Sequence, residues 1–198
     1  MHVAAAASLI ALLLVVGSLI RLHLLDTGLS PVRNAVSQYG ISSRPGGYRV
    51  ATLAFAAAGV ALAFALSDAT DGRASATVRL LVVFALARAV ISWFPMDAPG
   101  SALTRTGLWH GVLAILAFGG VTAAALKLAH ALARQSLLHG LAPTSTALGV
   151  LMAVLLLSMW LSRRVPVLQP RFGLVERAFY GCAITWFAVF AVACLLAA

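Results

Sequence analysis

Few ionisable side chains occur in the apolar part of this chain, and three of them fall close together in the sequence: Arg88, Asp97 and His110. Arg88 lies inside an apolar run, seven residues before Pro95. If the run is helical, the guanidinium lies roughly 10 Å below the end of the helix. A central arginine in a membrane helix costs about 2.5–3.5 kcal/mol, so we expect Arg88 to face the protein interior, paired with Glu176 or Asp97.

Two interpretations of Arg88 stay open at this point. The first is a structural ion pair whose long side chain reaches toward the membrane interface. The second is an anion site that holds a lipid phosphate or carboxylate. Arginine suits such a site because its planar guanidinium donates several hydrogen bonds at once.

His110 also has a structural and a chemical interpretation. In the structural one, an interfacial imidazole is hydrogen-bonded to Ser92 or Asp97. In the chemical one, His110 is a general base that Asp97 orients and that activates a nucleophile, for which Ser37 is the candidate. No G-x-S-x-G motif surrounds Ser37.

A metal site built from His110, Asp97 and Glu176 would lack the usual spacing, because the chain contains no H-x-x-x-H or H-E-x-x-H motif. For haem, His23 and His110 are the only two histidines expected at one face. We therefore predict no metal and no cofactor.

The composition is that of a membrane protein. Hydrophobic residues make up 62% of the 198 residues and charged residues 10%, against about 45–50% and roughly 25% in soluble chains. The net charge of +9 could suggest nucleic-acid binding, but the basic residues flank apolar runs and form no stripe. Flanking Lys and Arg are typical of cytoplasmic helix ends, so we expect no nucleic-acid partner.

Six apolar runs are each long enough to cross about 30 Å of hydrocarbon, and the prolines fall between them. We predict an all-α membrane protein, a bundle of six transmembrane helices forming a single domain over residues 1–198. The first run is interpreted as a retained helix, not a cleaved signal peptide. The expected helices span residues 3–22, 48–66, 78–94, 106–128, 144–161 and 174–196.

Basic residues are divided unequally between the two membrane faces that six crossings imply. Nine lie on the face of the first, third and fifth links, and four lie on the face of the termini, namely Arg73, Arg79, Lys127 and Arg134. The positive-inside rule then predicts that the odd-numbered links face the cytoplasm and both termini face outward.

The predicted cytoplasmic face also gathers most of the polar side chains with chemical potential. They come from the first link, the hairpin between the third and fourth helices, and the start of the sixth helix. We predict that they line one polar pocket, with these ligand-binding residues: Ser37, Gln38, Tyr39, Arg88, Asp97, His110 and Glu176.

Three short motifs support a family resemblance. The strings Val36-Ser37-Gln38-Tyr39-Gly40 and Trp93-Phe94-Pro95-Met96-Asp97, with Gly107 and His110, resemble the bacterial domain-of-unknown-function 998 family of six-helix integral membrane proteins. That family is distantly similar to the DRAM-like group of eukaryotic membrane proteins, which is associated with lipid handling. The resemblance covers nearly the whole chain and favours Ser37, Asp97 and His110 as site residues, but it implies no settled chemistry.

The leading hypothesis is a multi-pass protein of the bacterial inner membrane that binds the headgroup of a lipid or other amphiphile. One alternative is an intramembrane lipid hydrolase or transferase with His110 as base. Another is an accessory subunit whose small-residue helices dock on a membrane partner or on a second copy. Membrane lipids are the expected partners in the leading hypothesis.

Overall fold

The computed structural model describes residues 1–133 and 138–197, and the long elements in these ranges are all helices. The predicted fold class is confirmed. The long helices are α1 (His2–Leu24), α2 (Pro45–Ala69), α3 (Ser75–Val90), α4 (Arg105–Leu132), α5 (Ala142–Arg164) and α6 (Phe172–Leu196).

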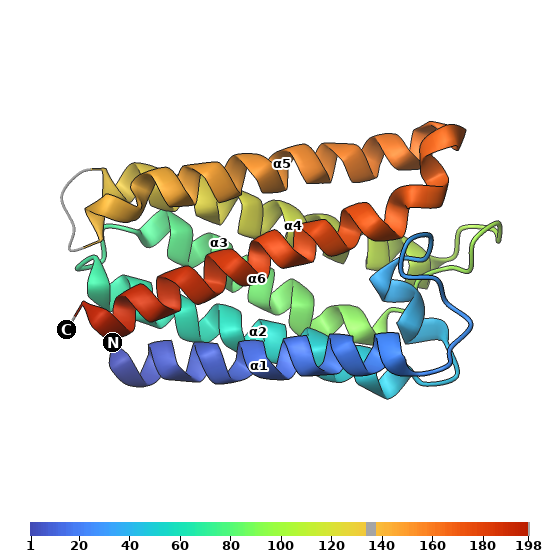
Figure 1. Cartoon of the computed structure of the whole chain (residues 1–198), viewed down its shortest axis with the longest axis horizontal. Coiled ribbons are helices and arrows are strands. Elements are labelled where there is room, and N and C mark those ends of the chain that lie inside the picture. The colour runs from blue at the N-terminus through green and yellow to red at the C-terminus, as the bar shows by residue number, and fades with distance from the viewer. Residues whose placement is uncertain (134–137, 198) are drawn as a thin grey trace.

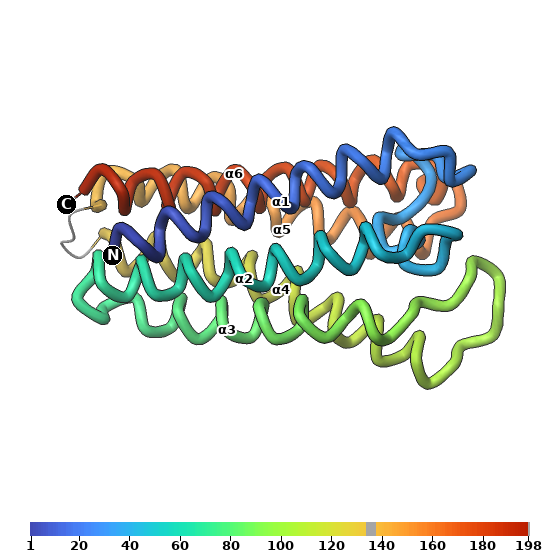
Figure 2. The backbone as a smooth tube through the Cα atoms, turned by 90° about the horizontal axis from the view of Figure 1, so that it is seen from below, coloured from blue at the N-terminus to red at the C-terminus, as the bar shows by residue number. Residues whose placement is uncertain are grey.

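These helices run antiparallel along one bundle, with both termini at the same end (Figure 1). Each helix packs on its neighbours in sequence, and α6 also packs on α1 and α2. The bundle therefore closes on itself. The link of residues 25–44, the hairpin of residues 94–104 and the turn before α6 all lie at the opposite end (Figure 2).

The centre of the bundle is filled by aromatic rings from α2, α3 and α6. Phe55 meets Phe84 at 5.0 Å and Phe187 at 5.2 Å between ring centroids, both edge to face. Such pairs contribute about 0.5–1.5 kcal/mol each beyond their area burial. The absence of a side chain at Gly59 lets α2 pack closely on α3, since a Cβ atom at this position would lie 2.9 Å from the Phe84 ring.

The outer surface is apolar where lipid would cover it. Leu13, Phe64, Leu86, Ile115 and Leu157 are among the large apolar side chains left exposed. In the described part of the chain, six helices are long and apolar enough to cross a membrane. A multi-pass membrane protein follows, because lipid leaves only internally hydrogen-bonded helices or closed barrels as spanning elements.

Helix boundaries extend past the predicted ones by one to four residues at most ends, because polar flanking residues continue the backbone hydrogen bonds. The third helix ends early, at Val90, and a 3₁₀ turn, η2 (Ile91–Trp93), completes it. The link between α1 and α2 contains a 3₁₀ helix, η1 (Val36–Ile41). Another, η4 (Pro166–Arg171), precedes α6. Arg134, counted in the charge asymmetry, lies outside the described residues.

Candidate functional site

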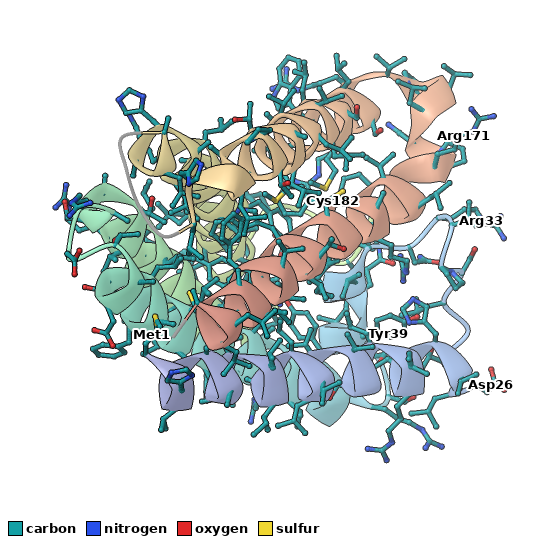
Figure 3. All side chains as sticks on the ribbon, turned by 60° about the vertical axis from the view of Figure 1, so that its left-hand side comes forward. Met1, Asp26, Arg33, Tyr39, Arg171 and Cys182 are labelled. Carbon is teal, nitrogen blue, oxygen red and sulfur yellow. The ribbon has the colours of Figure 1, made fainter. Side chains whose placement is uncertain are left out.

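A cavity of about 980 Å³ lies at the end of the bundle opposite the termini. Its wall is formed by the link of residues 25–44, α2, α3, the 94–104 hairpin, α4, α5, η4 and α6. Figure 3 shows Arg33 and Arg171 at this end of the molecule, with Met1 at the other.

Six of the seven residues predicted to line a pocket line this cavity: Ser37, Gln38, Arg88, Asp97, His110 and Glu176. Tyr39 does not. Its ring is buried between α1 and α6 (Figure 3), edge to face with His23 at 5.7 Å and 5.9 Å from the Arg177 guanidinium carbon. The residue after Gln38 points away because η1 turns the chain by about a third of a turn per residue.

Arg88 lies on α3 and is only 2% exposed. Its Nη1 donates a hydrogen bond to the Tyr180 hydroxyl at 2.9 Å, and its guanidinium carbon lies 5.4 Å from the Tyr180 ring centre and 5.7 Å from that of Phe55. Its Nε is buried without a hydrogen-bond partner. Among the described residues no carboxylate oxygen lies within 4.0 Å of the guanidinium. The expected ion pair with Glu176 or Asp97 is therefore wrong, and aromatic rings hold the cation instead.

Glu176 lies one turn into α6 and is buried. Its Oε2 accepts a hydrogen bond from the Val36 backbone N–H at 2.7 Å, which fastens the start of η1 to α6. Within the described chain this N–H is the single hydrogen-bond donor to the carboxylate. The rest of its acceptor capacity is available at the cavity wall, because an ionised carboxylate accepts about four hydrogen bonds.

Asp97 closes the 94–104 hairpin where it joins α4. Its carboxylate accepts from the Thr104 hydroxyl at 2.6 Å and from the Thr104 backbone N–H at 3.0 Å. These bonds hold the pKa of Asp97 below its ordinary value, because they stabilise the ionised form. Thr104 in turn caps α4 by accepting from the Gly107 N–H. A Cβ on Gly107 would overlap Asp97 Oδ2, so a side chain cannot fit there.

His110 lies in the second turn of α4 and is buried at the cavity wall. Its Nδ1 lies 2.8 Å from the Phe94 carbonyl oxygen, so the predicted bonds to Ser92 or Asp97 are wrong. A carbonyl only accepts, so Nδ1 carries the hydrogen. In the neutral ring Nε2 is then left with a lone pair. Ser92 Oγ is buried without a partner.

Ser37 is not bound to His110. Its hydroxyl donates to Met96 Sδ at 3.1 Å, which joins η1 to the hairpin. The neighbouring Gln38 accepts from the Asn34 side-chain amide. The hydroxyl and the imidazole line the same cavity without forming a nucleophile–base pair in this structure.

Sequence reasoning missed Tyr180, whose hydroxyl is the one that Arg88 contacts. It lies four residues after Glu176 on α6, so helical spacing alone puts both on one face. Tyr48, Arg33 and Arg163 also line the cavity. No spacing signal links them to it, because each comes from a different element.

A second polar cluster, beside the cavity, closes the link of residues 25–44 onto α6. Arg177 Nε donates to His23 Nε2 at 2.6 Å, and Nη1 donates to the Asn34 carbonyl at 2.7 Å. A Cβ on Gly173 would overlap that carbonyl oxygen, so the backbone of α6 packs directly against the backbone of the link at Asn34. This cluster was also missed, because the partners are more than 140 residues apart.

One side of the cavity is apolar. On α4 residues that line it recur every four positions, at Gly107, Gly111, Ile115 and Gly119. They cover roughly 18 Å of helix. Leu156 and Trp160 of α5 face this stripe. Ile115 also lines the cavity and is 70% exposed, so the cavity opens sideways toward the acyl-chain region.

Comparison with known proteins places the chain in one family. The family model described as "Protein of unknown function (DUF998)" matches residues 8–193. Searches of curated proteins and of solved structures give no match. The match includes most of α1 and α6, the whole of the four helices between them and every residue of the cavity wall. The chain belongs to the DUF998 family of proteins.

Proposed function

We propose that this protein binds an amphiphile through an anionic headgroup, which the cavity receives and Arg88 holds. The single observation that carries the proposal is the state of Arg88. It is a buried cation at a cavity wall, with aromatic rings and one hydroxyl as neighbours and no carboxylate within 4.0 Å among the described residues. Burying an unpaired charge is costly. An anion entering the cavity would compensate it.

The other charges of the cavity wall favour an anion as well. Arg33 and Arg163 also line it, so three cations face two carboxylates. One of these, Asp97, already accepts two hydrogen bonds from Thr104. The cavity is therefore electropositive.

The apolar side of the cavity favours an amphiphile over a soluble anion. A Cβ on Gly111 or on Gly119 would meet no atom within 4 Å, so these glycines border open space. The α4 stripe is roughly 18 Å long, which is slightly more than half of an approximately 30 Å hydrocarbon layer. A chain from one leaflet would fit along it, between α4 and α5.

Replacing Arg88 by methionine tests the proposal. Arg88→Met removes the charge while keeping an apolar stem. It is expected to preserve folding, because no carboxylate among the described residues lies within 4.0 Å to be left unpaired. We expect co-purifying anionic lipid, measured by native mass spectrometry, to fall by about tenfold.

The matched control is Arg105→Met, at the exposed first residue of α4. It removes the same charge from the same end of the bundle and is expected to retain the lipid. Equal retention in both variants would refute the proposal. An equal loss of lipid in both variants would also refute it, because it would show that positive charge anywhere at this end of the bundle attracts anionic lipid.

The accompanying proposals on location follow from the charge asymmetry. The protein is assigned to a bacterial inner membrane with its termini outside, so that the cavity opens to the cytoplasmic leaflet.

An accessory-subunit role has less support, because Gly59 and Gly120 pack against α3 and do not form a free docking face. A lipid hydrolase with Ser37 as nucleophile has less support too, since Ser37 donates to Met96.

A further inference from the structure

We infer that the bound headgroup carries, beside its anionic group, a hydrogen-bond donor such as a hydroxyl or an ammonium, and that His110 Nε2 and Glu176 accept from it. The inference rests on the proposed function and adds the chemical class of the headgroup. A cavity built for a bare anion would present donors only, whereas this one also presents two buried acceptors.

His110 is the first acceptor. The Phe94 carbonyl holds Nδ1 as the protonated nitrogen and orients the ring. Nε2 has no protein donor among the described residues, and the ring lies at the cavity wall. A lone pair in this position repels an anionic oxygen but accepts readily from O–H or N–H.

Glu176 is the second acceptor. It is 4% exposed and lines the cavity from α6. The Val36 N–H satisfies one oxygen, and no cation lies within 4.0 Å of either oxygen among the residues of known position. Buried polar groups are usually hydrogen-bonded, so a donor from the ligand would complete this carboxylate.

Donors and acceptors line the same cavity from different helices. Arg88 lies on α3, while His110 and Glu176 lie on α4 and α6. One headgroup can bind the Arg88 guanidinium and both acceptors only if it carries an anionic group and, at a second point, a hydrogen-bond donor. Phosphoglycerol and phosphoethanolamine have this character, and phosphomethanol and phosphocholine do not.

The test uses two pairs of lipids with identical acyl chains. Phosphatidylglycerol and phosphatidylmethanol have the same charge and differ in the headgroup hydroxyls. Phosphatidylethanolamine and phosphatidylcholine have the same charge and differ in the N–H donors. We expect the purified full-length protein to bind the donor-bearing member of at least one pair about tenfold more tightly, because the other leaves buried acceptors unpaired. Binding is measured by native mass spectrometry titration.

Two His110 variants assign the effect to Nε2. The amide of His110→Asn can replace Nδ1–H at the Phe94 carbonyl but has no atom at the Nε2 position. We expect His110→Asn to bind the two lipids of a pair almost equally, because the preference for the donor-bearing lipid is lost while phosphatidylmethanol still binds. In His110→Gln the longer amide supplies an oxygen near that position, so part of the preference is expected to remain. The pair separates loss of the acceptor from loss of structure.

Glu176→Gln identifies the donor. It keeps an acceptor oxygen but removes the charge, so it should weaken phosphatidylethanolamine more than phosphatidylglycerol if the carboxylate accepts from an ammonium. Equal binding of all four lipids by the wild type, with loss in Arg88→Met, would overturn this inference and leave the proposed function standing. No binding of any lipid would overturn the proposed function itself.

Discussion

At the scale of single residues, Gly107 in the first turn of α4 shows how a neighbouring side chain can make glycine the only residue that fits. Gly107 lies directly beneath the Asp97 carboxylate, whereas Gly111, one turn later, borders open space. We predict that Gly107→Ala lowers the Tm by about 5 °C, because the methyl group would displace the carboxylate from Thr104. Differential scanning fluorimetry in detergent measures this.

Gly111→Ala is the matched control for that prediction. It adds the same methyl group to the same helix without a clash, and alanine favours helix by about 1 kcal/mol over glycine. Its Tm should be unchanged or higher. If both variants behaved alike, the contact between Asp97 and the α4 backbone would be unimportant for stability.

The ionisation of Asp97 gives a second residue-scale prediction. Thr104 holds its pKa below the ordinary value. A depressed carboxyl pKa contributes stability above the unfolded pKa of about 3.9, and this contribution is lost as the pH falls through the folded pKa. The hairpin should therefore stay fastened at neutral pH and loosen only in strong acid.

Carbon NMR of the Asp97 carboxyl group can measure this directly. Thr104→Val removes the hydroxyl donor, and we expect the pKa of Asp97 to rise toward its ordinary value. Thr104→Ser keeps the hydroxyl and should keep the depressed pKa. A pKa that is the same in all three proteins would show that the Thr104 hydroxyl does not control the ionisation of Asp97.

At the scale of elements, α4 has two roles on one face: its first turn is capped by the hairpin, and the next three turns border the cavity. Small residues along this face leave the space that an acyl chain would occupy. We predict that Gly119→Leu, which fills this space, reduces lipid retention by about tenfold while leaving the helix intact. Native mass spectrometry of the purified variant is the measurement.

Gly181→Leu on α6 is the control for the filled groove. Gly181 is exposed and does not line the cavity, and a Cβ added to it would meet no atom within 4 Å. Retention should equal that of the unchanged protein. A loss in both variants would indicate that leucine at any outer glycine disturbs the bundle.

At the scale of the whole molecule, the termini and the cavity lie at opposite ends of the bundle. With both native cysteines, Cys182 and Cys194, replaced by alanine, single cysteines at Ser101 and Gly140 report the two faces. We predict that a membrane-impermeant maleimide labels Gly140→Cys in intact cells and labels Ser101→Cys only after lysis. The opposite pattern would reverse the proposed orientation.

The number of helices and their approximate ends could be predicted from the sequence. Backbone groups in lipid must be hydrogen-bonded within their own segment, so length, hydropathy and the positions of proline are sufficient. The residues near one face could also be predicted, because six antiparallel crossings bring alternate links together. This arrangement of links was sufficient to predict that one cavity gathers Ser37, Asp97, His110 and Glu176.

The contacts of those residues were decided by tertiary structure alone. Whether Arg88 meets Glu176 or Tyr180 depends on the rotation of α3 and α6 about their axes, and neighbours one turn apart on α6 compete for the same cation. Whether His110 meets Asp97 or the Phe94 carbonyl depends on the path of the hairpin backbone. Hydropathy is insensitive to such rotations and paths, because it depends only on which residues each segment contains.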